Sequence, residues 1–278
     1  MRPVESMRRQ VAAISESDLD RRVPQPDVDD EVGRLARTMN AMLERLQRSA
    51  DRQRRFVSDA SHELRSPLAS ARTTLEVALA HPETTTLEAT ATGTLAETAR
   101  MERLITDLLF LARSDEGRLT ASSGPVDVDD IVRPEAARVR SRGRVTVDTA
   151  KVSPGRAWGV ARQLEQAVRN LLENAEHHAR STVSVSLSDD GSGLLLEIVD
   201  DGPGVPPEER KRIFDRFVRL DEARARDGGG AGLGLAITRE IVVAHGGAVD
   251  VDDAPGQGAR FRLHLPKGTE EPAGRSET

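Results

Sequence analysis

Apolar residues recur every three or four positions in the N-terminal part of the chain, a spacing that predicts amphipathic helices. One such pattern consists of Val4, Met7, Val11 and Ile14, and a second of Val32, Leu35, Met39, Met42 and Leu46. Residues 24–30, which are rich in Pro and Asp, interrupt the period between the two patterns. Because stripes this narrow usually pack in bundles, we expect two helices joined by a polar connector.

A third helical pattern begins near Gln53, with the stripe Phe56, Ala60, Leu64, Leu68, Ala71, Leu75 and Leu79. Pro67 lies inside this pattern and is expected to bend the helix locally. After a turn at residues 81–85, a further helix runs to about Gly117. One face of this helix carries Leu95, Thr98, Glu102, Ile105, Leu108 and Ala112, and Leu104, Leu109 and Leu111 broaden it. Two antiparallel helices cannot bury both stripes, so we expect a homodimer that forms a four-helix bundle.

The pattern changes after a polar segment at residues 114–125. Short alternating or apolar runs then predict strands, at residues 145–149, 182–187, 194–200, 247–253 and 259–265. Helical patterns lie between them at 160–179 and 233–244. This order predicts an α/β sandwich, in which helices cover one sheet. The tail at 269–278 lacks apolar residues that could anchor it and is expected to be disordered.

Composition narrows the classes of function. The 278 residues are enough for roughly two domains. The net charge of −6 comes from 40 basic and 46 acidic residues with mixed signs, which gives no basic surface for nucleic acid. There is no cysteine, which excludes disulfides, thiol catalysis and cysteine-bound zinc. No apolar run reaches the ~18 residues of a membrane span, and we expect any membrane segment to lie upstream of this sequence.

His62 is the first candidate for chemistry, in the run SHELRSPL at residues 61–68. At 100° per residue it lies about 160–200° from Ala60 and Leu64, opposite the predicted buried stripe. Ser66, one turn later, shares the face of His62. An exposed imidazole is partly unprotonated near pH 7 and is then a nucleophile, and Glu63 can accept the proton of one ring nitrogen. The alternative is an ordinary surface histidine.

Polar residues and glycines in the second half suggest a phosphate site. Asn170 and Asn174 are four residues apart and share a helix face, where amide oxygens can meet a hard cation. Asp200 ends a strand and can accept a hydrogen bond from an adenine amino group. Glycines give the backbone close access to phosphate, and one glycine-rich run enters a helix whose N-terminus attracts anions. The glycines concerned are Gly202, Gly204, Gly230, Gly232 and Gly234. Structural turns and a buried amide network are the alternatives.

These motifs resemble those of sensor histidine kinases. The run at residues 61–68 is similar to the phosphoacceptor box of that family, which implies that His62 is phosphorylated and that Glu63 assists. Ser66 stands where the family usually has Thr or Asn, a position linked to dephosphorylation of the partner protein. Residues 1–49, with the run DEVG at 30–33, resemble a HAMP domain, which links a transmembrane helix to the kinase.

The ordered set in the second half resembles the Bergerat-type ATP-binding fold of histidine kinases, gyrase, Hsp90 and MutL. The resemblance implies that Asn174 binds Mg²⁺, that Asp200 binds adenine and that the glycine-rich run forms a lid over ATP. Asn170 occupies the position where gyrase-like and Hsp90-like ATPases carry the Glu that activates water. An amide cannot act as a general base, which favours His62 as the nucleophile. His177 stands where the family often has Lys, and Arg216 or Arg219 is a candidate partner for the phosphates.

The resemblance implies a domain order and a function. We expect a HAMP-like linker at 1–49, a dimerisation and phosphotransfer domain at 50–118, a linker at 119–125, an ATP-binding domain at 126–268 and a tail at 269–278. The function implied is an ATP- and Mg²⁺-dependent histidine autokinase on the cytoplasmic side of the membrane, which passes the phosphoryl group to an Asp of a response regulator. The alternatives are an ATPase switch of the gyrase or Hsp90 kind, and a scaffold or phosphatase with impaired kinase activity.

Overall fold

The computed structural model describes residues 20–24, 31–115, 123–220 and 231–267, and the chain divides into two units, residues 1–69 and 70–278. The predicted helix around Val4 to Ile14, the tail at 269–278 and Gly230 lie outside the described residues. Within the described residues, no helix combines the length and the apolar character that a membrane crossing requires.

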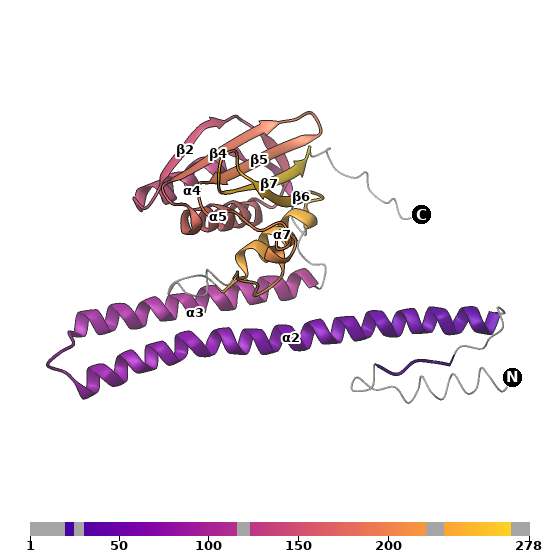
Figure 1. Ribbon diagram of the computed structural model, residues 1–278, viewed down its shortest axis with the longest axis horizontal. Coiled ribbons are helices and arrows are strands. Elements are labelled where there is room, and N and C mark those ends of the chain that lie inside the picture. Colours follow the sequence, from indigo (N-terminus) through magenta and orange to yellow (C-terminus); the bar gives the residue numbers. More distant parts are fainter. Residues whose placement is uncertain (1–19, 25–30, 116–122, 221–230, 268–278) are drawn as a thin grey trace. The chain divides into compact units, whose positions relative to one another are not determined.

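The first unit is built on α2 (Glu31–Ala80), a helix of 50 residues that continues through Pro67 (Figure 1). The two helical patterns predicted from Val32 to Leu46 and from Gln53 to Leu79 are thus parts of one helix, which at 1.5 Å per residue is about 75 Å long. A small core joins the helix to the segment before it, and consists of Val23, Ala36, Met39 and Leu43.

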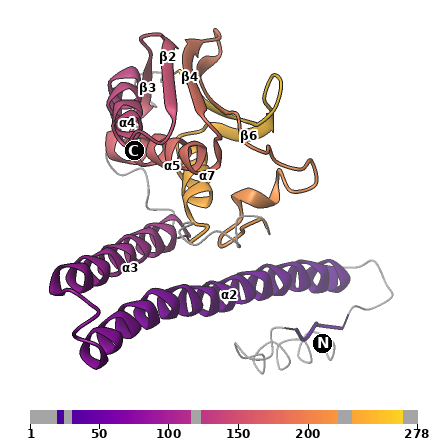
Figure 2. The ribbon, with the colours of Figure 1, turned by 60° about the vertical axis from the view of Figure 1, so that its left-hand side comes forward.

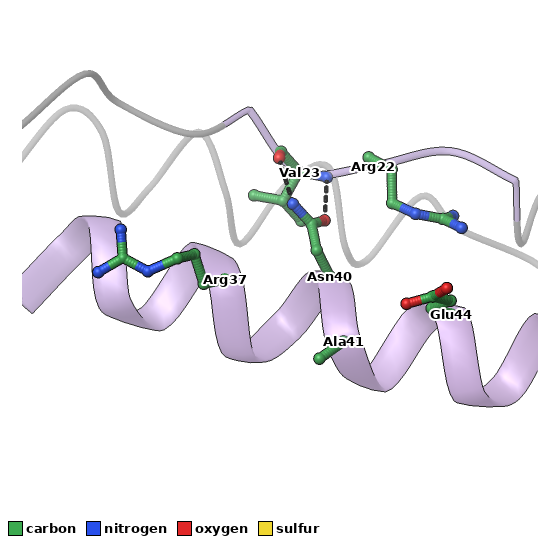
Figure 3. A pocket seen from close by; sticks show the side chains of 6 residues that line it. All are labelled: Arg22, Val23, Arg37, Asn40, Ala41 and Glu44. Carbon is green, nitrogen blue, oxygen red and sulfur yellow. Dashed lines mark hydrogen bonds between the residues drawn. The ribbon is translucent and has the colours of Figure 1, made fainter.

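Asn40 fixes the segment before α2 at this core. Its amide oxygen accepts the backbone N–H of Val23 at 2.8 Å, and its amide nitrogen donates to the Val23 carbonyl at 3.0 Å. Figure 3 shows both bonds, at a shallow pocket lined by Arg22, Val23, Arg37, Asn40, Ala41 and Glu44. One side chain thus satisfies both backbone groups of a buried residue, as burial of a peptide group requires.

In the second unit, the end of α2 turns into α3 (Leu87–Asp115). The hydroxyl of Thr86 accepts the Ala89 N–H at 3.2 Å and caps α3. The buried apolar residues of α3 are Leu104 and Leu111, which lie seven positions apart and therefore on one face. Leu95 and Ile105 of the predicted stripe are 68% and 46% exposed in the single chain, where two antiparallel helices were not expected to bury both stripes. Within the chain, α3 packs against α7.

The remainder of the second unit is an α/β domain, as predicted. Its five-stranded sheet has the order β2-β4-β5-β7-β6, in which β2 and β4 are parallel and the other pairs antiparallel. The strands are β2 (Thr146–Val152), β4 (Thr182–Asp189), β5 (Gly193–Asp200), β6 (Ala248–Asp253) and β7 (Ala259–Pro266). All five lie at runs predicted as strands.

Three helices cover one face of this sheet (Figures 1 and 2). They are α4 (Asp129–Ser141), α5 (Ala161–His178) and α7 (Gly234–Ala244). Alternate residues of β7 point into the core between sheet and helices, and Phe261 and Leu263 are fully buried. Ile237 and Ile241 of α7 are buried one turn apart, so this helix presents a continuous apolar face.

Four elements were not predicted, and α4 is one of them. β1 (Gly124–Asp127) pairs antiparallel with β3 (Arg156–Gly159), and η1 (Arg212–Phe214) is a single 3-10 turn. β1 contains Gly124 and Pro125, which we had assigned to the linker at 119–125. The strand forms because its backbone pairs with β3, an interaction that four residues with a single buried side chain, Val126, do not reveal in the sequence.

Candidate functional site

His62 lies on α2 in the first unit and is exposed, as its helical phase predicted. Ser66 is exposed one turn later, and Glu63 is half-buried. Ala60 and Leu64, on the opposite side of the helix, are half-buried. The structure therefore presents the imidazole to solvent on the surface of a helix, where it is accessible to a partner domain or protein.

Asp200 ends β5 and is 3% exposed. Its Oδ1 accepts the backbone N–H of Gly202 at 2.9 Å and that of Ala259 at 3.3 Å. Its Oδ2 is buried and has no hydrogen-bond partner within the described part of the chain. Burial raises the pKa of the Asp200 carboxyl. A buried acceptor without a donor is costly, so Oδ2 is suited to a ligand that brings an N–H group.

Glycines allow the backbone to fold tightly around this carboxylate. A Cβ on Gly202 would lie 2.4 Å from the carbonyl oxygen of His178, and Gly204 has a φ of 81°. Gly258 has a φ of 116°, and a Cβ there would lie 1.9 Å from the Asp200 carbonyl oxygen. Gly258 was missed as a site residue and lies in the turn between the last two strands, β6 and β7.

Asn170 links α5 to the start of α7. Its Nδ2 donates to the carbonyl oxygen of Gly234 at 3.0 Å, and the hydroxyl of buried Thr238 donates to the same oxygen at 2.9 Å. Because a carbonyl only accepts, the amide nitrogen of Asn170 must face Gly234, and Oδ1 points to the other side. Asn174 lies one turn further along α5 and is half-buried. Thr238 was not predicted as part of the site.

The end of the glycine-rich run is fixed to the segment after η1. Gly232 has a φ of 71°, and its carbonyl oxygen accepts the N–H of Phe217 at 3.0 Å. Phe217 itself has a φ of 62°, which is uncommon for a residue with a side chain. Gly230, the first glycine predicted for this run, lies outside the described residues.

Asp200, Gly202 and Gly204 thus form one corner of a site. The His178 carbonyl, at the end of α5, contacts Gly202, which joins this corner to the helix of Asn170 and Asn174. The rings of His177 and His178 meet edge to face, with centroids 4.9 Å apart.

Arg216, one candidate for the phosphates, forms an ion pair with Asp115 at 2.9 and 2.7 Å. This hydrogen bonding raises the pKa of the guanidinium. Arg219, the other candidate, is half-buried.

Ion pairs hold α5 against the neighbouring helix α4. Glu176, which is 5% exposed, accepts from Arg142 at 2.6 Å, and buried Glu135 accepts from Arg169 at 2.9 Å. Glu173 accepts from Arg138 on α4 at 2.7 Å. These pairs join α4 to α5, and the Glu173 carboxylate is engaged by Arg138.

The chain matches three known family models. Residues 159–269 match the model of the "Histidine kinase-, DNA gyrase B-, and HSP90-like ATPase". Residues 52–117 match the "His Kinase A (phospho-acceptor) domain", and residues 1–48 match the HAMP domain. The chain belongs to the sensor histidine kinases of two-component systems. Its α/β domain is therefore the ATP-binding domain of such a kinase.

The relatives of this sensor histidine kinase carry similar names. It is 37% identical to the signal transduction histidine-protein kinase/phosphatase MprB of Mycolicibacterium paratuberculosis, over 100% of this chain and 56% of that protein. It is 34% identical to the sensor histidine kinase CusS of Escherichia coli, over 95% of this chain and 56% of that protein. The chain thus spans a little more than half the length of these curated relatives.

Solved structures of histidine kinases share the fold. The structure of full-length ShkA in complex with AMPPNP aligns with a TM-score of 0.54 and 28% identity, over 78% of this chain and 46% of that one. The Acinetobacter baumannii histidine kinase AdeS aligns with a TM-score of 0.62 and 20% identity, over 75% of this chain and 98% of that one.

Proposed function

We propose that this chain is an ATP- and Mg²⁺-dependent histidine autokinase that phosphorylates His62 and then transfers the phosphoryl group to an Asp of a response regulator. The observation that carries the proposal is the buried Oδ2 of Asp200, which has no donor among the residues that the structure describes and fits the amino group of adenine. The exposed His62 supplies a nucleophile on a helix of the matched phosphoacceptor domain.

The residues of the α/β domain fit the needs of phosphoryl transfer, which are positioning and charge neutralisation. Asn174 would bind Mg²⁺ through its amide oxygen, together with phosphate oxygens. Gly232 and Gly234 give backbone access beside the N-terminus of α7, whose N–H groups favour phosphate. Asn170 supports attack by histidine rather than water, because its amide is no base and its nitrogen is committed to the Gly234 carbonyl.

In the proposed reaction, an unprotonated ring nitrogen of His62 attacks the γ-phosphorus of ATP. A phosphorus–nitrogen bond forms, the bond to the bridging oxygen breaks, and ADP leaves. Glu63 accepts the proton from the other ring nitrogen. In the second step the response regulator's carboxylate attacks the phosphorus, the phosphorus–nitrogen bond breaks, and Glu63 returns its proton to the ring, which restores neutral His62.

We further propose that the kinase acts as a homodimer on the cytoplasmic side of the membrane. In a single chain, large apolar residues of α2 and α3 are exposed, among them Leu79 at 83% and Leu87 at 87%. A second copy could cover them in a four-helix bundle. The match to a HAMP domain supports a connection to an upstream membrane segment.

One experiment tests the kinase proposal. The full chain is incubated with Mg²⁺ and γ-labelled ATP, and we expect acid-labile, base-stable label that is absent from His62→Gln. His81→Gln, which alters another exposed histidine of the same domain, is the matched control and should label normally. Label that persists in His62→Gln would refute the proposal. Sustained phosphate release without phosphoprotein would favour an ATPase switch, and failure to bind ATP in calorimetry would favour a scaffold.

A phosphatase activity is the second proposal, since Ser66 is exposed on the face of His62 and relatives are named kinase/phosphatase. The Ser66 hydroxyl can hold a water for hydrolysis of the phosphorylated response regulator. Ser66→Ala should lower the rate of that hydrolysis about tenfold or more, the usual scale for one positioned polar group, and leave labelling of His62 intact. Ser66→Thr should retain the activity. Equal hydrolysis by all three proteins would refute this role.

A further inference from the structure

Helices α5 and α7 pack against each other and are joined by hydrogen bonds at two contact points. The first contact point is the bond from Asn170 to Gly234, at the start of α7. The second contact point lies at the other end of α7, where the ring of His245 meets the backbone of Val160, the N-cap residue of α5. Neither the phosphoryl transfer described above nor the sequence motifs use His245.

The hydrogen bonds of His245 define its protonation. Its Nε2 lies 3.0 Å from the backbone nitrogen of Val160, and its Nδ1 lies 2.7 Å from the carbonyl oxygen of Ile241. A backbone N–H only donates and a carbonyl only accepts. The ring must therefore be neutral, with its proton on Nδ1 and a lone pair on Nε2 that receives the Val160 N–H.

The ring of His245 is also closely packed against the backbone. Gly159, just before α5, is buried, and a Cβ there would lie 2.4 Å from Cδ2 and 2.7 Å from Nε2 of His245. The imidazole thus lies directly against the backbone that enters α5. Val160 has no side-chain cap of its own, so the acceptor for its N–H comes from α7.

The spacing of the two contact points matches on both helices. Val160 and Asn170 are ten positions apart on α5, or about 15 Å, and Gly234 and His245 are eleven apart on α7, or about 16 Å, at 1.5 Å per residue. The helices run in opposite directions between the two points. Both hydrogen bonds are therefore satisfied in one axial register, and a slip by one residue would break both.

We propose that His245 is a positioning residue that sets the register of α7 against α5, and thereby holds Gly234 against Asn170 at the nucleotide site. The inference rests on the proposed function, because it assigns the nucleotide to this site. It connects a residue at the far end of α7 to the helix that carries the proposed Mg²⁺ ligand, Asn174. His245 acts only through the helices and touches no reacting atom.

Two substitutions separate this role from simple packing. In His245→Gln, the amide oxygen reaches about as far as Nε2 and can still accept the Val160 N–H. In His245→Asn, the amide nitrogen can still donate to Ile241, but nothing reaches Val160. His264→Asn is the matched control, since the ring of His264 on β7 bonds to the Ser192 hydroxyl and takes no part in the two contact points.

The full chain and its variants are compared by calorimetry with Mg²⁺ and ADP, and by NMR of the Asn170 side-chain amide without nucleotide. We expect His245→Asn to bind ADP about fivefold to twentyfold more weakly, the scale of one buried hydrogen bond. The ADP affinities of His245→Gln and His264→Asn should lie within about twofold of the ADP affinity of the parent chain. The Asn170 amide resonances should shift in His245→Asn only.

The ring itself gives an independent signal. Nitrogen NMR of His245 should show a protonated Nδ1 and an unprotonated Nε2 in the parent chain. The opposite tautomer, or unchanged Asn170 resonances in His245→Asn, would overturn the proposal, as would equal ADP affinity of the Asn and Gln variants. If the parent chain bound no ADP, the proposed function would fail, while the Asn170 resonances would still decide the role of His245.

Discussion

Arg216 binds the carboxylate of Asp115 with both terminal nitrogens of its guanidinium, at 2.9 and 2.7 Å. Asp115 is the last residue of α3, and Arg216 follows η1 in the α/β domain. Beside this pair, the Ser114 hydroxyl donates to Glu240 of α7 at 2.8 Å. The bidentate geometry is specific, but the Asp115 side chain is 60% exposed. An exposed pair contributes about 1 kcal/mol or less, so the contact is suited to release.

We predict that Asp115→Asn loosens the α/β domain from α3. The sequence has no cysteine, so Thr106→Cys on α3 and Ser188→Cys on β4 give unique sites for a fluorescent pair. The distribution of distances between the labels should broaden in Asp115→Asn and narrow again in the charge-exchanged pair Asp115→Arg with Arg216→Asp. A distribution that is unchanged in Asp115→Asn would contradict the prediction.

The control for this experiment is Asp215→Asn. It breaks the ion pair of Asp215 with Arg239 at 3.2 Å, which has a similar exposure but lies within the α/β domain. The distribution should be unaffected.

Asp200→Asn is predicted to weaken the binding of adenine nucleotides selectively. The Asn oxygen can keep the bonds from Gly202 and Ala259, but a donor then stands at the position of Oδ2. Facing the adenine amino group, this donor should reduce affinity about tenfold to hundredfold. Calorimetry with ADP measures the loss, and Asp201→Asn is the control on the neighbouring carboxylate. Equal ADP affinity in Asp200→Asn and the parent would contradict the adenine assignment.

The elements with a strong period could be predicted from the sequence, and those that depend on distant partners could not. The helices α5 and α7 and the five main strands have clear periodicity. α4 contains Pro134 and buries the charged Glu135. Its place depends on ion pairs to α5 that form only in the folded domain.

The same limit applies to the site. The resemblance of motifs led to Asp200 and Asn174. The orientation of the Asn170 amide depends on Gly234, which is 64 residues away, and that of the His245 ring on Val160, which is 85 residues away. No local sequence pattern reveals such contacts, and the sequence does not distinguish two glycines of one turn whose surroundings differ.

Gly256 and Gly258 illustrate this difference and give a matched pair. Both have a positive φ, of 106° and 116°, but an added Cβ meets nothing within 4 Å at Gly256. Gly256→Ala should cost about 1–2 kcal/mol from backbone strain alone. Gly258→Ala adds a clash with the Asp200 carbonyl and should cost clearly more, on the order of 3 kcal/mol or above. Urea unfolding measures both, and similar midpoints for the two variants would contradict the close packing around Asp200.

Asp107 of α3 should make stability depend on pH. Gln166 of α5 donates to it at 3.4 Å. Burial raises the pKa of Asp107 from 3.8 to about 6, against a lowering influence of Arg103 and with a smaller raising influence of Glu173. A raised pKa means that the folded chain binds the proton more tightly than the unfolded chain. The contribution of Asp107 to stability is therefore fully present below pH 4 and is lost as the pH rises through 6.

We accordingly predict that Asp107→Asn stabilises the chain at pH 7–8 by about 1–3 kcal/mol, because a shift of one pKa unit corresponds to about 1.4 kcal/mol. The gain should fall towards zero near pH 4, where the parent carboxyl is protonated. Urea unfolding at several pH values from 4 to 8 measures this difference. Asp127→Asn should show the opposite sign, since hydrogen bonding from Arg156 lowers the pKa of Asp127 and its stabilising effect is lost as the pH falls. A gain in Asp107→Asn that is the same at every pH would refute the role of a buried, titrating carboxyl.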